Sequence, residues 1–188
     1  KLVHAEKIWE AAKKMDPSFT CSKMFWWYNM YSGADYSVTP RPNYSADGRK
    51  LPDCYSHPAE LRDELQNELG QFPLFKFWGP ATDVSSTQWI ADASIYSDKK
   101  YDPTLSLIYL PHLDYCLQKY GQDIAAIKKD LSEIDKIVEQ LVSYYSAKKA
   151  KIILLSEYGI ANVDRPVHIN RELRKNGLLQ LRTERGLE

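Results

Sequence analysis

The residues with the clearest chemical potential are two acidic residues that each follow a short apolar run. Asp114 comes just after the run 105–110, and Glu157 comes just after the run 152–155. A pair of carboxylates at neighbouring strand ends is the arrangement that holds one or two divalent metal ions in enzymes that transfer phosphoryl groups. The alternative interpretation is that both acidic residues only cap helices or lie on the surface.

Two histidines are candidates for additional ligands of such a site. His112 lies two residues before Asp114, directly after the proline that ends the apolar run, and His168 lies downstream of Glu157. Neutral imidazole is a common metal ligand in proteins. The alternative is that each histidine is hydrogen-bonded within the structure and binds no ion.

A strand, a helix and a second strand would bring the two carboxylates together. The runs 105–110 and 151–155 are almost continuously apolar, which predicts strands covered on both faces. Between them, apolar residues recur at spacings of three and four over residues 124–145, which predicts one face of a long helix. Such a crossover leaves its two strands parallel, so Asp114 and Glu157 should emerge at the edge where α/β proteins bind ligands.

The remaining elements are predicted from periodicity and from Pro and Gly positions. Helices are expected over 1–15, over 58–69, from a Ser-Ser-Thr start at 85–87, and within 165–177; strands are expected before the aromatic segment 25–31, over 72–79 (or an extended cover there) and over 178–184. Together these elements predict a single α/β domain over residues 1–188, with three layers and a mainly parallel sheet flanked by helices.

Composition limits the classes of function. The 188 residues carry 25 basic and 25 acidic side chains and no formal net charge, so bulk charge favours neither nucleic acid nor an anionic membrane as a partner. The three cysteines, Cys21, Cys54 and Cys116, are widely spaced, which fits a reducing compartment. Since no apolar run reaches the roughly 20 residues of a membrane span and no signal-peptide pattern is seen, a cytoplasmic protein is expected.

The aromatic and Pro-rich part, residues 25–83, supplies candidate substrate contacts. Trp27 lies in a dense aromatic stretch, and Arg41 lies in the irregular segment 33–53 that follows. Exposed aromatic rings stack on bases or sugars, and an arginine attracts an anionic substrate, to which His168 would add a further polar contact. The alternatives are that the rings fill the core and that Arg41 is a solvated surface residue.

Three segments of this chain, taken in order, resemble sequence motifs of a known family. Residues 114–121 read Asp-Tyr-Cys-Leu-Gln-Lys-Tyr-Gly, residues 156–159 read Ser-Glu-Tyr-Gly, and residues 170–179 read Asn-Arg-Glu-Leu-Arg-Lys-Asn-Gly-Leu-Leu. They resemble the Asp-x-x-x-His, Ser-Asp-His-Gly and Asn-x-x-Leu-x-x-x-Gly-Leu-Leu motifs of the alkaline phosphatase superfamily, in its type I phosphodiesterase and nucleotide pyrophosphatase branch. The resemblance covers residues 105–181 and implies an alkaline-phosphatase-like core, here incomplete, with 25–83 as an insert or cap-like portion.

The resemblance also implies metal positions, and this sequence departs from the family at several of them. Asp114 and Glu157 occupy two of those positions, with Glu157 in place of an aspartate, while Gln118 and Tyr158 stand where the family has histidines. Glutamine and tyrosine are poorer zinc ligands than imidazole. The implied cofactor is therefore a divalent metal, either zinc or an oxygen-preferring ion such as manganese or magnesium, with His112 as a replacement for the lost imidazole.

The resemblance further implies a function and its limits. The expected parent is a metal-dependent hydrolase of small phosphorylated substrates, and the chain itself is expected to be an inactive central fragment, because the family's nucleophile and some ligands find no match in it. Alternatives are a non-catalytic binding or interaction module derived from the same fold and an unrelated small α/β domain. An incomplete sheet would also expose an edge, which predicts self-association.

Overall fold

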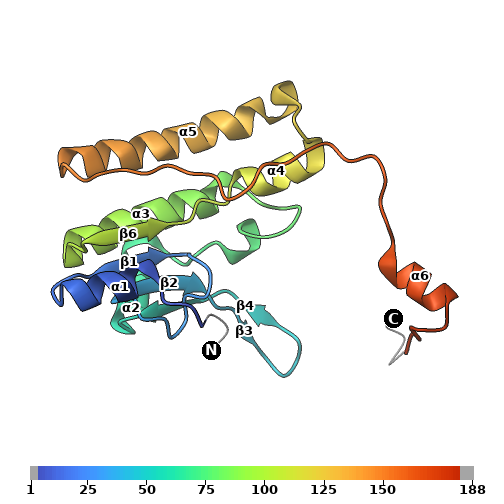
Figure 1. Ribbon diagram of the computed structural model, residues 1–188, viewed down its shortest axis with the longest axis horizontal. Helices are drawn as coiled ribbons and strands as arrows, with labels where there is room; N and C mark the ends of the chain where they lie inside the picture. The colour runs from blue at the N-terminus through green and yellow to red at the C-terminus, as the bar shows by residue number, and fades with distance from the viewer. Residues whose placement is uncertain (1–3, 183–188) are drawn as a thin grey trace.

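The structure is a computed structural model that describes residues 4–182 (Figure 1). Its helices are α1 (Ile8–Met15), α2 (Glu60–Leu69), the 3₁₀ helix η1 (Leu74–Lys76), α3 (Val84–Tyr101), α4 (Leu113–Tyr120), α5 (Ile124–Ala147) and α6 (Ile169–Lys175). Its strands are β1 (Cys21–Met24), β2 (Tyr36–Pro40), β3 (Asn43–Tyr44), β4 (Lys50–Leu51), β5 (Cys54–His57) and β6 (Leu105–Ile108).

The main sheet has four strands in the order β5-β2-β1-β6. Strand β1 is parallel to both neighbours, since Ser22 pairs with Tyr36 of β2 and with Ser106 of β6. Strand β5 is antiparallel to β2, while β3 and β4 form a separate two-stranded ribbon. The predicted α/β class is confirmed, with a mixed sheet in which three parallel strands end at the same edge.

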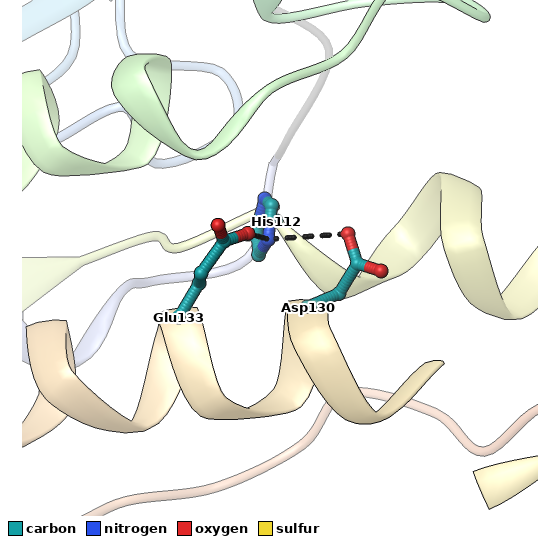
Figure 2. A group of neighbouring side chains, drawn as sticks. All are labelled: His112, Asp130 and Glu133. Atoms are coloured by element: carbon teal, nitrogen blue, oxygen red, sulfur yellow. Dashed lines mark ion pairs between the residues drawn. The ribbon is translucent and has the colours of Figure 1, made fainter. Parts of the chain in front are cut away.

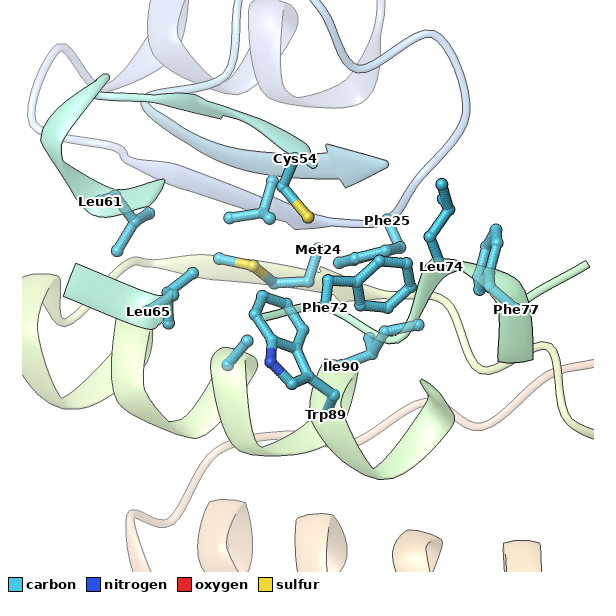
Figure 3. Close-up of a cluster of buried hydrophobic side chains, with 12 residues drawn as sticks. Met24, Phe25, Cys54, Leu61, Leu65, Phe72, Leu74, Phe77, Trp89 and Ile90 are labelled. Carbon is cyan, nitrogen blue, oxygen red and sulfur yellow. The ribbon is translucent and has the colours of Figure 1, made fainter. Parts of the chain in front are cut away.

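Helices cover both faces of this sheet (Figure 1). On one face α1 contributes Trp9, which packs with Cys21 of β1 and Ala34. On the other face α2, η1 and α3 enclose the largest core, which contains Met24, Phe25, Val38, Cys54, Leu61, Leu65, Phe72, Leu74, Phe77, Trp89, Ile90 and Ala93 (Figure 3). Helix α5 forms an outer layer on α3, because Ile137 and Leu141 pack against Ala91.

The two long helices α3 and α5 begin at acidic residues. The side chain of Asp83 accepts a hydrogen bond from the Ser85 amide at the start of α3, and Asp123 accepts two at the start of α5. Such caps satisfy amides that have no partner within the helix. The helix predicted from 85–87 is therefore confirmed as α3, but its capping side chain is Asp83 rather than a serine or threonine. The long helix predicted over 124–145 is confirmed as α5.

The strand predicted over 151–155 is wrong. This segment pairs with no strand among residues 4–182, and its apolar side chains face solvent, with Ile153 77% and Leu154 72% exposed. The prediction assumed cover on both faces, which the surrounding described residues do not supply. After α5 the chain runs back toward the end of α4, where the side chain of Gln122 donates to the Ile160 carbonyl at 2.8 Å, but it does so without forming the second strand of the predicted crossover.

Two further predicted strands are also corrected. Residues 72–79 contain η1, because Phe72, Leu74 and Phe77 turn inward together to fill the core under β1. Residues 178–182 form no strand, and the rest of that predicted element, 183–184, lies outside the described residues. The helices predicted over 58–69 and within 165–177 are confirmed as α2 and α6.

The cysteines are free thiols. Cys21 and Cys54 are buried, and Cys116 is half-buried. Burial raises the pKa of Cys21 to about 11 and that of Cys54 to about 12, so both remain protonated and pack as small apolar side chains. None of the helices within residues 4–182 combines the length and the apolar character that crossing a membrane requires.

The burial pattern predicts that truncating two apolar side chains, Leu65 and Ile153, has very different effects on the free energy of unfolding. Leu65→Ala removes a side chain that is 1% exposed and should lower the free energy of unfolding by about 2–5 kcal/mol through lost burial and a residual cavity. Ile153→Ala removes a side chain that is 77% exposed and should change it by less than about 0.5 kcal/mol. Urea denaturation measures both; a cost for Ile153→Ala equal to that for Leu65→Ala would show that segment 151–155 is a buried strand after all.

Candidate functional site

The carboxyl ends of the three parallel strands surround an aromatic pocket. Phe25 and the residues after it extend from β1, Thr39 and Pro40 end β2, and Tyr109 follows β6. These residues line the pocket together with Trp26, Trp27, Tyr28, Phe77 and Trp78. Ligands of open α/β sheets bind beyond the carboxyl ends of the strands, and this pocket lies at that edge.

The loop after β1 presents its aromatic rings to this pocket in a fixed conformation. Phe25 is buried, whereas Trp27 is 57% exposed and its ring lies 6.1 Å from that of Tyr109. Phe25 and Tyr28 have φ angles of +59° and +53°, a left-handed conformation that non-glycine residues rarely adopt. Buried Asn29 holds the turn, because its side-chain amide donates to the carbonyls of Lys23 at 2.8 Å and Val38 at 2.7 Å.

Lys23 lies beneath this loop and was missed by the sequence analysis. The residue is 1% exposed in the central strand β1, its Nζ lies 3.5 Å from the Trp27 carbonyl oxygen, and it stands 4.5 Å from the centre of the Trp9 ring. Burial lowers the pKa of Lys23. A basic residue in a short strand carries no signal that would separate this buried position from an exposed one.

Asp114 and Tyr158 meet at the same edge, although they are 44 residues apart in the chain. Asp114 lies in the first turn of α4, and the Tyr158 hydroxyl donates a hydrogen bond to its Oδ1. This hydrogen bond, partial burial and the neighbouring negative charges raise the pKa of Tyr158 to about 12. The phenol is therefore protonated at neutral pH, and it occupies one oxygen of the carboxylate.

Glu157 belongs to the same neighbourhood. Burial raises the pKa of Tyr109, and the negative charges of Asp114 and Glu157 raise it further. Tyr109 thus connects the acidic pair to the aromatic pocket that it lines. Asp114, Glu157 and Tyr158 thus lie near one another beside the end of β6, although the second strand that was predicted to deliver Glu157 there does not form.

The motif residues do not form a closed zinc site in this arrangement. Among residues 4–182, a group of three His, Cys, Asp or Glu side chains with ligand atoms within 4.8 Å occurs once, and it contains neither Asp114 nor Glu157. Gln118 lies one turn after Asp114 on α4, exposed to solvent, and adds a neutral amide. The carboxylates and the amide offer oxygen atoms, which manganese and magnesium accept more readily than zinc does, while the protonated phenol of Tyr158 is a poor ligand for any of them.

The His112 side chain points toward Asp130 and Glu133 of α5 (Figure 2). Its Nε2 lies 3.4 Å from Asp130 Oδ1 and 3.3 Å from Glu133 Oε2. Residues two apart in a helical segment point in roughly opposite directions, about 200° apart, so His112 does not replace an imidazole beside Asp114. Asp130 and Glu133 were missed; the available signal was that Asp130 interrupts the buried stripe of α5 between Ile127 and Ile134.

The two other substrate candidates lie in different places. Arg41 is exposed directly after β2, next to the pocket residue Pro40, and its amide donates to the Asp53 carbonyl at 2.9 Å. His168 is the N-cap residue of α6, which lies apart from the sheet in Figure 1. The structure therefore places Trp27 and Arg41 at the carboxyl edge, and His168 away from it.

The fold defines the class of protein as an α/β domain whose three parallel strands end at one edge, beside an aromatic pocket. The family model for type I phosphodiesterase / nucleotide pyrophosphatase matches residues 1–187. The chain therefore belongs to this family of phosphodiesterase and nucleotide pyrophosphatase-type domains, a branch of the alkaline phosphatase superfamily. No curated protein and no solved structure gave a significant match.

The contact between Tyr158 and Asp114 predicts an unusual titration. Nuclear magnetic resonance of chain labelled at the tyrosine ring carbons, with the signal assigned through Tyr158→Phe, should show Tyr158 titrating near pH 12. Asp114→Asn should lower that pKa toward the ordinary value of about 10, because the negative charge that favours the protonated phenol is gone. A Tyr158 pKa near 10 in the unmodified chain would contradict the contact.

Proposed function

We propose that this domain contributes a phosphodiester- or nucleotide pyrophosphate-binding edge to a metal-dependent hydrolase, and that residues 1–188 by themselves are inactive because they contain no match to the family's nucleophile. The observation that carries the proposal is the position of Tyr109, which lines the aromatic pocket and lies near Asp114 and Glu157; burial raises its pKa, and the charges of these two carboxylates raise it further. A nucleotide has the matching two parts, a flat base that stacks on aromatic rings and a phosphate group that needs compensating positive charge.

The residues of the edge divide into two roles in this proposal. Trp27 and Tyr109, with rings 6.1 Å apart, supply the faces on which a base or another flat group stacks. Asp114 and Glu157 supply carboxylate oxygens for a divalent ion of the manganese or magnesium type, which would neutralise charge on the phosphate. Arg41, exposed beside Pro40, adds a cation within the same region.

A second candidate function, a binding module without catalysis, is favoured by a specific contact. The Tyr158 hydroxyl is hydrogen-bonded to Asp114 Oδ1, so one oxygen of the central carboxylate already has a partner from the chain. Gln118 and Tyr158 provide neutral donors where the family has imidazoles. A module of this kind would keep the aromatic pocket and its ligand while losing turnover.

The proposed partner is a small phosphorylated molecule rather than a nucleic acid, in line with the absence of net charge. Self-association stays a prediction. It is supported by β6, which is an edge strand of the main sheet, and by the exposed apolar residues Ile153 and Leu154. A cytoplasmic location also stays a prediction, in keeping with the free cysteines.

Turnover of bis(p-nitrophenyl) phosphate by the full-length protein tests the proposal. With added manganese or magnesium, the unmodified protein should release p-nitrophenol, and Asp114→Ala with Glu157→Ala should reduce kcat/KM about 100-fold or more, because charge stabilisation at the phosphate is lost. The matched control is Asp135→Ala with Glu139→Ala, a pair of exposed acidic residues on α5, which should leave turnover unchanged.

Two results would contradict the proposal. Full activity in the Asp114, Glu157 double variant would place the chemistry elsewhere. No turnover by folded, unmodified protein with any of manganese, magnesium or zinc, together with retained nucleotide binding, would establish the binding module instead.

A further inference from the structure

A second cluster of ionisable side chains lies outside the carboxyl edge, between α4 and α5 (Figure 2). His112 comes from the start of α4, and Asp130 and Glu133 come from consecutive turns of α5. The His112 side chain is 4% exposed, and neither of its ring nitrogens has a hydrogen-bond partner. A buried imidazole that makes no hydrogen bond is costly, and the Nε2 of this one faces two carboxylates, which indicates that a ligand completes its surroundings.

The spacing of the three groups matches a metal site better than a hydrogen-bonded one. His112 Nε2 lies 3.4 Å from Asp130 Oδ1 and 3.3 Å from Glu133 Oε2, beyond the usual hydrogen-bond length of about 2.7–3.2 Å. Ligands at about 2.0–2.1 Å from a tetrahedral zinc ion are separated from each other by about 3.3–3.4 Å. An ion placed among these three atoms would therefore find two of its ligand pairs already at the required separation.

The charges of the cluster also call for a cation. Asp130 and Glu133 are three residues apart on one face of α5, where two carboxylates repel each other. Lys129 Nζ lies 3.6 Å from Glu133 Oε1, on an exposed side chain, so it partners the other oxygen of Glu133 and leaves Oε2 toward His112. One imidazole and two carboxylates are a ligand set typical of zinc and related divalent transition metals.

We propose that His112 Nε2, Asp130 Oδ1 and Glu133 Oε2 bind one divalent transition-metal ion of the zinc class. The fourth coordination position is left to solvent. The ion ties the start of α4, and thereby the end of β6, to α5. This site uses none of the family-motif residues Asp114, Gln118, Glu157 or Tyr158, so it is independent of the function proposed above.

Titration of the metal-free chain with Zn²⁺, and with Co²⁺ as a spectroscopic probe, tests this site. In the Asp114→Asn, Glu157→Gln background, which removes the carboxylates proposed for the carboxyl edge, one equivalent should still bind, the Co²⁺ complex should show the visible absorption of tetrahedral coordination, and the melting temperature should rise with Zn²⁺ concentration. Asp130→Asn with Glu133→Gln should weaken binding about 10-fold or more while conserving side-chain shape. Asp130→Asn alone should weaken it as well, which keeps the test valid if the double variant folds poorly.

Two control variants separate this site from its alternatives. Asp135→Asn with Glu139→Gln changes the same number of charges on α5 and should leave the affinity unchanged. Asp114→Asn with Glu157→Gln should also leave it unchanged, whatever happens to turnover. Absence of saturable binding would overturn the proposal and leave the three side chains in contact with one another without an ion. Binding that survives in Asp130→Asn with Glu133→Gln but is lost in Asp114→Asn with Glu157→Gln would overturn it too.

Discussion

The parallel pairing of β1 with β2 on one side and with β6 on the other is the constraint on which the rest of the structure depends. Because Met24 pairs with both Val38 and Ile108, the three strands end together and the chain must leave all of them on one side. The aromatic loop after β1 and the acidic start of α4 are brought together by this register. A one-residue slip in β1 would turn its side chains to the opposite faces of the sheet.

The aromatic loop after β1 is held at the carboxyl edge of the sheet by core packing and by hydrogen bonds of Asn29. The aromatic core formed by Phe25, Phe72 and Trp89 fixes the first residue of the loop from below, with Phe25 and Phe72 ring centres 4.7 Å apart. Asn29 then bonds the loop to the ends of β1 and β2. These contacts hold the loop that carries Trp27, although Trp27 itself is exposed. A stacking surface needs this kind of preorganisation.

Helices with a clear periodic pattern of apolar residues could be predicted from the sequence. The tertiary contacts of individual side chains could not. Helix α5 follows from its apolar stripe, whereas the contact between Asp114 and Tyr158 does not come from the predicted crossover, because residues 151–155 form no strand. The run 151–155 misled because four apolar residues indicate burial only if other elements cover them. The contacts of His112 with α5 depend on the packing angle between two helices, which no local pattern encodes, and Lys23 is buried by tertiary context alone.

The central proposal is that ligand binds at the carboxyl edge of the sheet, in its aromatic pocket. The indole N–H signals of the five tryptophans report on this most directly during titration with a non-hydrolysable nucleotide and Mg²⁺. The account predicts that the pocket residues Trp26, Trp27 and Trp78 shift, while Trp9 and Trp89, which are buried away from solvent, stay unchanged. Saturable binding that leaves Trp26, Trp27 and Trp78 unshifted would contradict it.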